Sequence, residues 1–259
     1  MVLKLNFFAP KNNQDPTLAN ETSFEDDSRS YMSVIDHLDE LRARLITIII
    51  YLVIAFIVSL FFTKPVLKLL EAPAGHITFQ SLSIEEPLFV FFKITFYLAL
   101  AITAPLILGQ IYLFIKPGLT KNERKMVQPL LIGSPLLFYM GVYFAYTCLL
   151  PAMLHFFLNF GQGICPINQR LDFYISLTTS ILFYLGLCFQ LPIVLFVLSL
   201  AKVVNSTMLL KVWRYAIFAA TIVSAIITPD PTAFSMLIVL TALSSLYFFS
   251  ILLIKLFGN

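Results

Sequence analysis

The chain has 259 residues, of which 59% are hydrophobic and 12% are charged, and its formal net charge is +3. Soluble domains contain about 45–50% apolar and about 25% charged residues, so this composition predicts an integral membrane protein. It excludes soluble, disordered and nucleic-acid-binding classes, and the three cysteines (Cys148, Cys165 and Cys188) are too few for a disulfide framework.

Residues 1–31 are polar, rich in acidic residues and without periodic apolar positions, which predicts a disordered tail. The tail has no apolar core, so it does not resemble a signal peptide, and its acidic residues argue against a transit peptide. We therefore expect the chain to be made in the compartment that inserts it. Residues 32–257 are expected to form one membrane domain.

An amphipathic segment, residues 33–45, precedes the first long apolar run. Ser33 and Asp36 match a helix-capping pattern, and Ile35, Leu38, Leu41 and Leu45 recur at spacings of three and four. This pattern predicts a helix that lies at the membrane interface before the chain crosses the bilayer. Its carboxylates have two interpretations. They form a solvated face with pairs such as Glu40 and Arg44, or they belong to a binding site.

Six apolar runs follow, at residues 45–62, 88–115, 127–150, 176–200, 213–227 and 233–254. A bilayer core of about 30 Å needs about 20 helical residues. The runs lack the alternation of barrel strands. We predict an all-α integral membrane protein with six transmembrane helices. Lys93 lies in the second run near its outer end, where its long side chain can snorkel to the surface.

The loop after the second run, residues 114–125, carries a carboxylate among cations. Pro117 and Gly118 end the preceding helix, and Thr120 with Glu123 forms a capping box that opens the next one. Glu123 has two compatible interpretations. It caps a helix, and it offers a carboxylate at the membrane surface to a cation from outside.

Gln190 is the most polar residue inside the fourth run, two residues before Pro192, which is expected to kink the helix. A buried amide usually bonds to a neighbouring helix. Gln190 therefore either packs the bundle or docks a partner helix.

The fifth run is short, because residues 213–227 reach only about 22 Å as a helix. The following residues, Thr228, Pro229, Asp230 and Pro231, prevent extension. The fifth and sixth helices are therefore predicted to be short and to form a tight hairpin that does not cross the full bilayer, either thinning it locally or packing against other helices.

The distribution of lysine and arginine predicts the orientation. Most of these residues lie in the amino-terminal part, in the loops after the second and fourth runs and at the carboxyl end, whereas the other loops hold only Lys64, Lys68 and Arg170. Both termini are therefore predicted to face the cytoplasm or its equivalent.

Catalytic, metal and cofactor sites find no support in the sequence. His37, His76 and His155 lie far apart and show no helical pairing, and no intramembrane acid pair or Ser/His set suggests a catalytic centre. We expect no enzyme activity, no metal and no cofactor. Two other classes share this composition: a small-solute secondary transporter, which would need polar groups along a pathway, and a membrane-embedded enzyme or redox subunit.

These segments together resemble TatC, the multispanning subunit of the twin-arginine protein translocase. The resemblance is carried by HLDELRARL (37–45), LLEAPAGHITF (69–79), FIKPGLTKNERK (114–125), LLFYMGVYFAY (136–146), LGLCFQLP (185–192), WRYAIF (213–218) and ITPDPTAFS (227–235). It covers about residues 32–257 in the family's order. The segment containing Pro73 and the glutamine at 190, where many bacterial members have glutamate, is most similar to the cyanobacterial and plastid branch.

The resemblance implies a receptor that binds twin-arginine signal peptides of folded proteins and recruits single-span TatA- and TatB-type partners for transport driven by the proton gradient. The family's signal-binding carboxylates fall on Glu40 and Glu123, and neighbouring motif residues fall on Arg42, Phe114 and Pro117. Gln190, Asp230 and Pro73 are expected to dock partners or support the fold.

The expected location is the thylakoid membrane of a plastid, with the amino terminus in the stroma, or a cyanobacterial membrane. The expected assembly contains several copies of this chain together with its single-span partners.

Overall fold

The computed structural model describes residues 34–75, 78–116, 121–161, 169–228 and 233–257. They fall into two units, Met1–Ala43 and Arg44–Asn259. Of the first unit only residues 34–43 are described, and they are the first turns of helix α2. The predicted tail and the capping residue Thr120 lie outside the described residues, and the division into tail and membrane domain stays a prediction.

Six helical stretches of the described chain are long and apolar enough to cross a membrane, which confirms the predicted all-α class. The helices are α2 (Val34–Glu71), α3 (Glu86–Ile115), α4 (Lys121–Phe144), α5 (Leu150–Gly161), α6 (Leu171–Cys188), α7 (Leu191–Leu200), α8 (Ser206–Ile227) and α9 (Ala233–Phe257). Short elements join them: the 3-10 turn η1 (Ala72–Ala74), strands β1 (Phe79–Gln80) and β2 (Gln169–Arg170), and a π-turn η3 (Ala145–Leu149).

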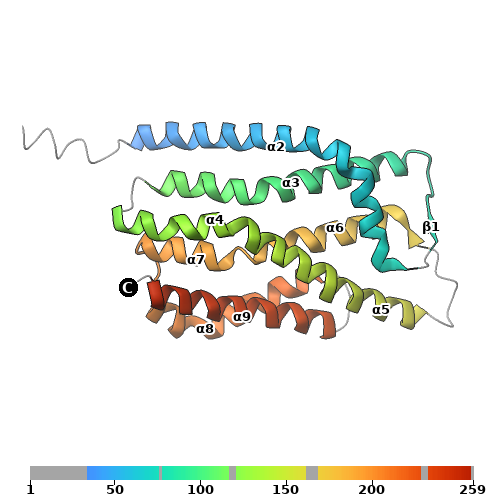
Figure 1. Cartoon of the computed structure of the whole chain (residues 1–259). Coiled ribbons are helices and arrows are strands. Elements are labelled where there is room, and N and C mark those ends of the chain that lie inside the picture. The colour runs from blue at the N-terminus through green and yellow to red at the C-terminus, as the bar shows by residue number, and fades with distance from the viewer. Residues whose placement is uncertain (1–33, 76–77, 117–120, 162–168, 229–232, 258–259) are drawn as a thin grey trace, which may run out of the picture. The chain divides into compact units, whose positions relative to one another are not determined.

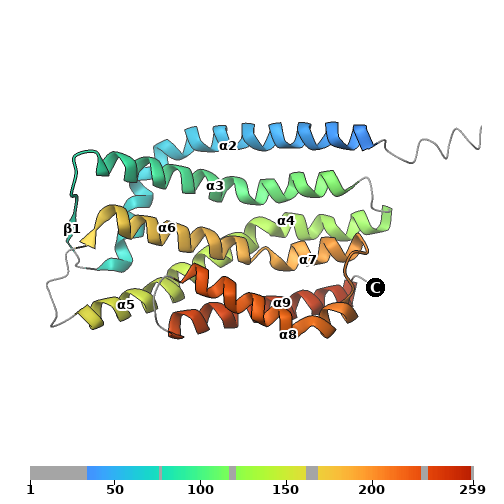
Figure 2. The same ribbon diagram turned by 180° about the vertical axis from the view of Figure 1, so that it is seen from behind.

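The helices of the second unit run between two ends (Figures 1 and 2). At one end, α3, α7 and α9 finish and α4 and α8 begin. We call it the basic end, because Lys116, Lys121 and Lys255 lie at these helix termini. At the capped end lie η1, β1 and β2. There β1 and β2 pair in parallel, with Phe79 opposite Gln169 and Gln80 opposite Arg170, so two loops about 90 residues apart in the chain are joined.

Two helices begin earlier in the chain than the apolar runs predicted, because the polar residues before each run are helical as well. The segment predicted as an interfacial helix has no break before the first span, because both belong to α2. The fifth helix begins at Ser206, not near Trp213, and its 22 residues extend over about 33 Å. The prediction that this helix is too short to cross was therefore wrong for the helix itself, since Ser206–Val212 is helical although its composition is mixed.

Three spans depart from straight, uninterrupted helices. The fourth span is broken into α6 and α7 at Phe189 and Gln190, just before Pro192, which confirms the predicted kink. The third span continues through η3 into α5 and so reaches Gly161, beyond its predicted end. α2 changes direction over its last turns (Figure 1), close to Pro65 inside the helix.

α6 is the packing centre of the second unit, in contact with α3, α4 and α8. In the most apolar stretch of the α6–α7 span, 56% of residues are buried within the chain, against 11% for α8. Two glycines allow the close approach of α4 and α6. A Cβ at Gly186 would lie 2.8 Å from the Phe138 ring, and one at Gly141 would lie 2.7 Å from the Phe189 ring.

Tyrosine hydroxyls satisfy the last carbonyls of α2. Tyr146 donates to the carbonyl of Leu69 at 2.9 Å, and Tyr174 donates to that of Leu70 at 2.7 Å. These groups are among the four that a helix leaves unbonded at its end. α2 is thereby fastened to both η3 and α6 near the capped end.

Candidate functional site

The residues expected to bind a signal peptide belong to three helix ends. Glu40 and Arg42 lie in the first turns of α2, in the first unit, where Glu40 is half-buried and Arg42 is exposed. Phe114 is in the last turn of α3 and is half-buried. Glu123 belongs to the first turn of α4, where only the backbone is described. Pro117 lies outside the described residues.

Phe114 and the first turn of α4 share the basic end of the second unit (Figure 1). The short connection between α3 and α4 places them there.

A hydrogen-bonded group that sequence reasoning missed lies near this end. Arg44 donates from Nη1 to Oε1 of Gln110 at 3.3 Å, and Nε2 of Gln110 donates to the Tyr51 hydroxyl at 3.4 Å. Gln110 is buried in α3, with 7% of its surface exposed. The signal that could have found it is an amide inside an otherwise apolar span, the same feature that singled out Gln190.

Gln190 is used within the chain. Its Nε2 donates to the Ser134 carbonyl at 3.0 Å, and its Oε1 accepts from the Ser134 hydroxyl at 3.4 Å. Both residues are buried, and Ser134 precedes Pro135 in α4. Gln190 therefore holds the break between α6 and α7 against α4.

The capped end contains a second polar cluster that the sequence did not reveal. The Glu86 carboxylate accepts the backbone N–H of Leu82 at 2.7 Å and that of Asp172 at 3.2 Å, and it pairs with Arg170 at 3.5 Å. Glu86 is buried whereas Arg170 is half exposed. One carboxylate thus joins the loop before α3 to the loop before α6.

Lys93 extends this cluster. Its ammonium group pairs with the Asp172 carboxylate and donates to the Ser176 hydroxyl at 2.5 Å. The expectation that Lys93 snorkels was incomplete, because its charge is balanced by a partner on α6. Pro73 also belongs to the capped end, where it lies in η1 and is half-buried. Asp230 lies outside the described residues.

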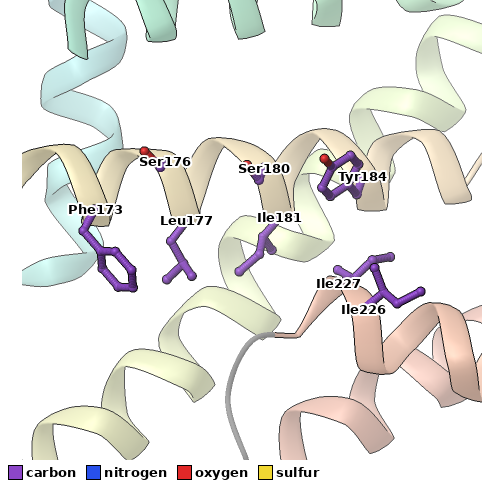
Figure 3. A pocket seen from close by; sticks show the side chains of 8 residues that line it. All are labelled: Phe173, Ser176, Leu177, Ser180, Ile181, Tyr184, Ile226 and Ile227. Atoms are coloured by element: carbon purple, nitrogen blue, oxygen red, sulfur yellow. The ribbon is translucent and has the colours of Figure 1, made fainter. Parts of the chain in front are cut away.

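A hollow of about 290 Å³ opens between α6 and the end of α8 (Figure 3). Phe173, Leu177 and Ile181 of α6 point toward it, and Ile226 and Ile227 of α8 close the opposite side. The Ser180 hydroxyl lies on the far side of α6, where it is hydrogen-bonded to Tyr97 at 2.9 Å. The hollow therefore presents mainly apolar side chains where two helices diverge, with Ser176, Ser180 and Tyr184 also in its lining.

Across the described ranges, no three His, Cys, Asp or Glu side chains gather in a way that could hold a metal ion.

The fold and its polar clusters define a multi-pass helical membrane protein with a fastened capped end and a basic end. A family model described as Sec-independent protein translocase protein (TatC) matches residues 36–241. The chain belongs to the TatC family and is a protein translocase subunit that works in a complex.

The similar proteins include cyanobacterial and chloroplast ones. The chain is 37% identical over 228 residues to the Sec-independent protein translocase protein TatC of a Synechocystis strain, covering 88% of this chain and 90% of that protein. It is 34% identical to the chloroplastic protein TATC of Oryza sativa subsp. japonica, covering 88% of this chain and 64% of the rice protein.

A solved structure gives the same fold. The crystal structure named as twin arginine translocase receptor TatC matches with a TM-score of 0.75 and 37% identity, over 86% of this chain and all of the other.

Proposed function

We propose that this subunit is the receptor for twin-arginine signal peptides on folded cargo. The proposal is carried by one observation: the family motifs of this chain bring a carboxylate, Glu123, to the first turn of α4 at the basic end. A solved relative at 37% identity is itself named a twin arginine translocase receptor, which supports the same role.

The chemistry of the signal supports carboxylate recognition. Adjacent guanidinium groups are planar and always charged, and they bind carboxylates through paired hydrogen bonds. Lysine provides a point charge and not that fork. We assign Glu123 to direct contact with the arginine pair and Glu40 to support of that contact, with Arg42, Phe114 and Pro117 completing the surface.

The test is a titration in nanodiscs. A labelled signal peptide with an Arg-Arg pair and its Lys-Lys counterpart are titrated against the wild-type protein, Glu123→Gln and Glu40→Gln. A charged hydrogen bond contributes about 1.5–3 kcal/mol, so Glu123→Gln is expected to weaken Arg-Arg binding by tenfold or more and to remove the preference over Lys-Lys.

The matched control is Glu85→Gln, which neutralises an exposed carboxylate at the capped end. It should bind the Arg-Arg peptide like the wild type. Equal binding of both peptides by the wild-type protein would contradict the receptor role.

Partner recruitment is proposed for the α6–α8 hollow and the neighbouring outer face of α8, with Pro73, Gln190 and Asp230 in docking or supporting roles. The partners are single-span helices of the TatA and TatB type, several copies of the chain assemble with them, and the proton gradient drives transport. The apolar wall of the hollow supports this assignment, because a transmembrane helix needs an apolar surface to pack against.

Crosslinking tests the docking surface. Photoreactive residues are placed at Val223 and Ile226, which are 38% and 75% exposed, and Gln190 serves as a buried comparison at 3%. Adducts with partner helices are expected from the two α8 positions. Adducts from an exposed position elsewhere, such as Phe61, with none from α8, would refute the assignment.

We further propose that both termini face the stroma and that the protein resides in the thylakoid membrane, or in a cyanobacterial membrane. Lys116, Lys211 and Lys255 lie at or near the basic end, and loops rich in lysine and arginine usually stay on the side from which the chain is inserted. Protease protection of epitope tags at either terminus in oriented vesicles tests it.

A further inference from the structure

The first half of α8 carries an exposed cluster of basic and aromatic side chains. Leu210, Lys211, Trp213, Arg214, Tyr215 and Phe218 line a shallow hollow on this one helix. We call these six residues the α8 patch. Trp213 is 41% exposed and Tyr215 is 77% exposed.

The two cations of the α8 patch have no acidic partner among the described residues. Within the ranges that the structure describes, no ion pair to a carboxylate involves Lys211 or Arg214. The sequence contains no Asp or Glu between Asp172 and Asp230, and α8 itself contains none. The Arg214 guanidinium lies over the Trp213 ring, 5.7 Å from its centroid. This contact is with an aromatic ring, so it orients Arg214 without supplying a negative charge.

The patch lies at a specific depth of a membrane span. α8 begins at Ser206, at the basic end, and Lys211 and Arg214 follow in its second and third turns. From Tyr215 to Ile227 the helix advances only about 20 Å, against a hydrocarbon core of about 30 Å. Charged groups are costly inside that core, whereas tryptophan and tyrosine favour the interface. The patch therefore belongs at the level of the lipid headgroups.

An apolar stripe continues from the patch toward the capped end. Phe218 and Ile222 follow Arg214 at intervals of four residues, so they lie on the same side of the helix. They are 66% and 47% exposed. A cationic pair with an exposed apolar stripe below it matches a molecule with an anionic head and a long acyl chain.

We propose that the α8 patch is a binding site for an anionic lipid of the leaflet at the basic end. Lys211 and Arg214 bind the phosphate or sulfonate of the headgroup, Trp213 and Tyr215 flank it at the interface, and an acyl chain lies along Phe218 and Ile222. The bound lipid anchors α8 to this leaflet.

The test uses the fluorescence of Trp213, the only tryptophan of the chain. The full-length protein is placed in phosphatidylcholine nanodiscs that contain a small, equal fraction of brominated phosphatidylglycerol or brominated phosphatidylcholine. Bromine quenches tryptophan at short range, so the ratio of the two quenching strengths reports local lipid enrichment. Each lysine or arginine near the membrane surface favours binding of an anionic lipid. With two such cations, we expect the anionic lipid to be enriched about three- to tenfold around Trp213.

Variants locate the site. Lys211→Gln with Arg214→Gln should bring the quenching ratio close to one, whereas the control Lys68→Gln, which removes one exposed cation at the capped end, should leave it unchanged. Using a ratio within each variant removes the change in emission caused by losing the Arg214–Trp213 contact. An unaltered thermal unfolding midpoint confirms that the double variant is folded.

Two outcomes would overturn the proposal. One is a quenching ratio near one for the wild-type protein. The other is an anionic preference that persists in the double variant. A wild-type ratio near one, together with a salt-sensitive crosslink from position 215 to an acidic protein segment, would assign the patch to a protein partner instead. The signal-peptide titration is independent of this result, because it is measured at Glu40 and Glu123.

Discussion

The α6–α7 span and the α8 span differ sharply although both are apolar helices of the same unit. The first is buried on several sides by α3, α4 and α8, and its residues Gln190 and Ser180 are hydrogen-bonded to α4 and α3. The second exposes Trp213, Tyr215 and Phe218 and packs mainly on α9. The difference indicates that α6 and α7 stabilise the fold, whereas α8 is available to lipids and partners.

The packing of α6 against α4 can be broken most severely at Gly186. Its α-carbon faces the fully buried Phe138 ring, so Gly186→Ala forces that ring to move and is expected to lower the free energy of unfolding by about 1–3 kcal/mol, and Gly186→Leu by more. Thermal unfolding in detergent measures the loss.

The control for this prediction is Gly109→Ala in α3, where an added Cβ meets no atom within 4 Å. Alanine also favours the helix, so this variant should be as stable as the wild type or slightly more stable. Equal losses at both glycines would show that α6 has no special packing role.

A smaller effect is expected at Gln190. Replacement by leucine removes both hydrogen bonds to Ser134 and should cost about 1 kcal/mol, since hydrogen bonds between membrane helices contribute on average about 0.6 and at most about 1.7 kcal/mol. Thermal unfolding in detergent measures the loss, and Ser134→Ala, which removes only the hydroxyl contact and keeps the carbonyl acceptor, should cost less. Unchanged stability of Gln190→Leu would favour a docking role over a structural one.

The smallest effect on stability is expected on the outer face of α8. Ile226→Ala removes a side chain that is 75% exposed, so the free energy of unfolding should change by no more than about 0.5 kcal/mol. Transport in the presence of the partner subunits should nevertheless fall if this face docks them. A large loss of stability with normal transport would reverse the contrast between the two spans.

Much of the fold was predictable because apolar runs of about 20 residues have few alternatives in a membrane protein. The six spans, the kink before Pro192 and the family followed from such runs and from ordered motifs. The length of α8 was not predictable from its apolar run, because its first turns are helical although they contain polar residues.

The polar clusters were harder to predict, since they join residues distant in the sequence. Glu86 is one of several acidic residues between the first two spans, and only its meeting with Arg170 and the Asp172 backbone distinguishes it. Gln110 and Arg44 are 66 residues apart. The signal-binding residues are expected from family motifs alone. They belong to different helices, so no periodic pattern in the sequence predicts how they are arranged in space.

The joining of β1 to β2 has a consequence for how the protein is made. Phe79 pairs with Gln169, so the capped end cannot close until the third span and the loop after it have been synthesised. Until then Glu86 lacks Arg170 and the Asp172 amide and must remain in water. The first two spans therefore enter the bilayer as an unfastened pair. Closure of the capped end therefore requires three spans and the loop that follows them, whereas the β1–β2 pairing itself uses no residue of the α8–α9 hairpin.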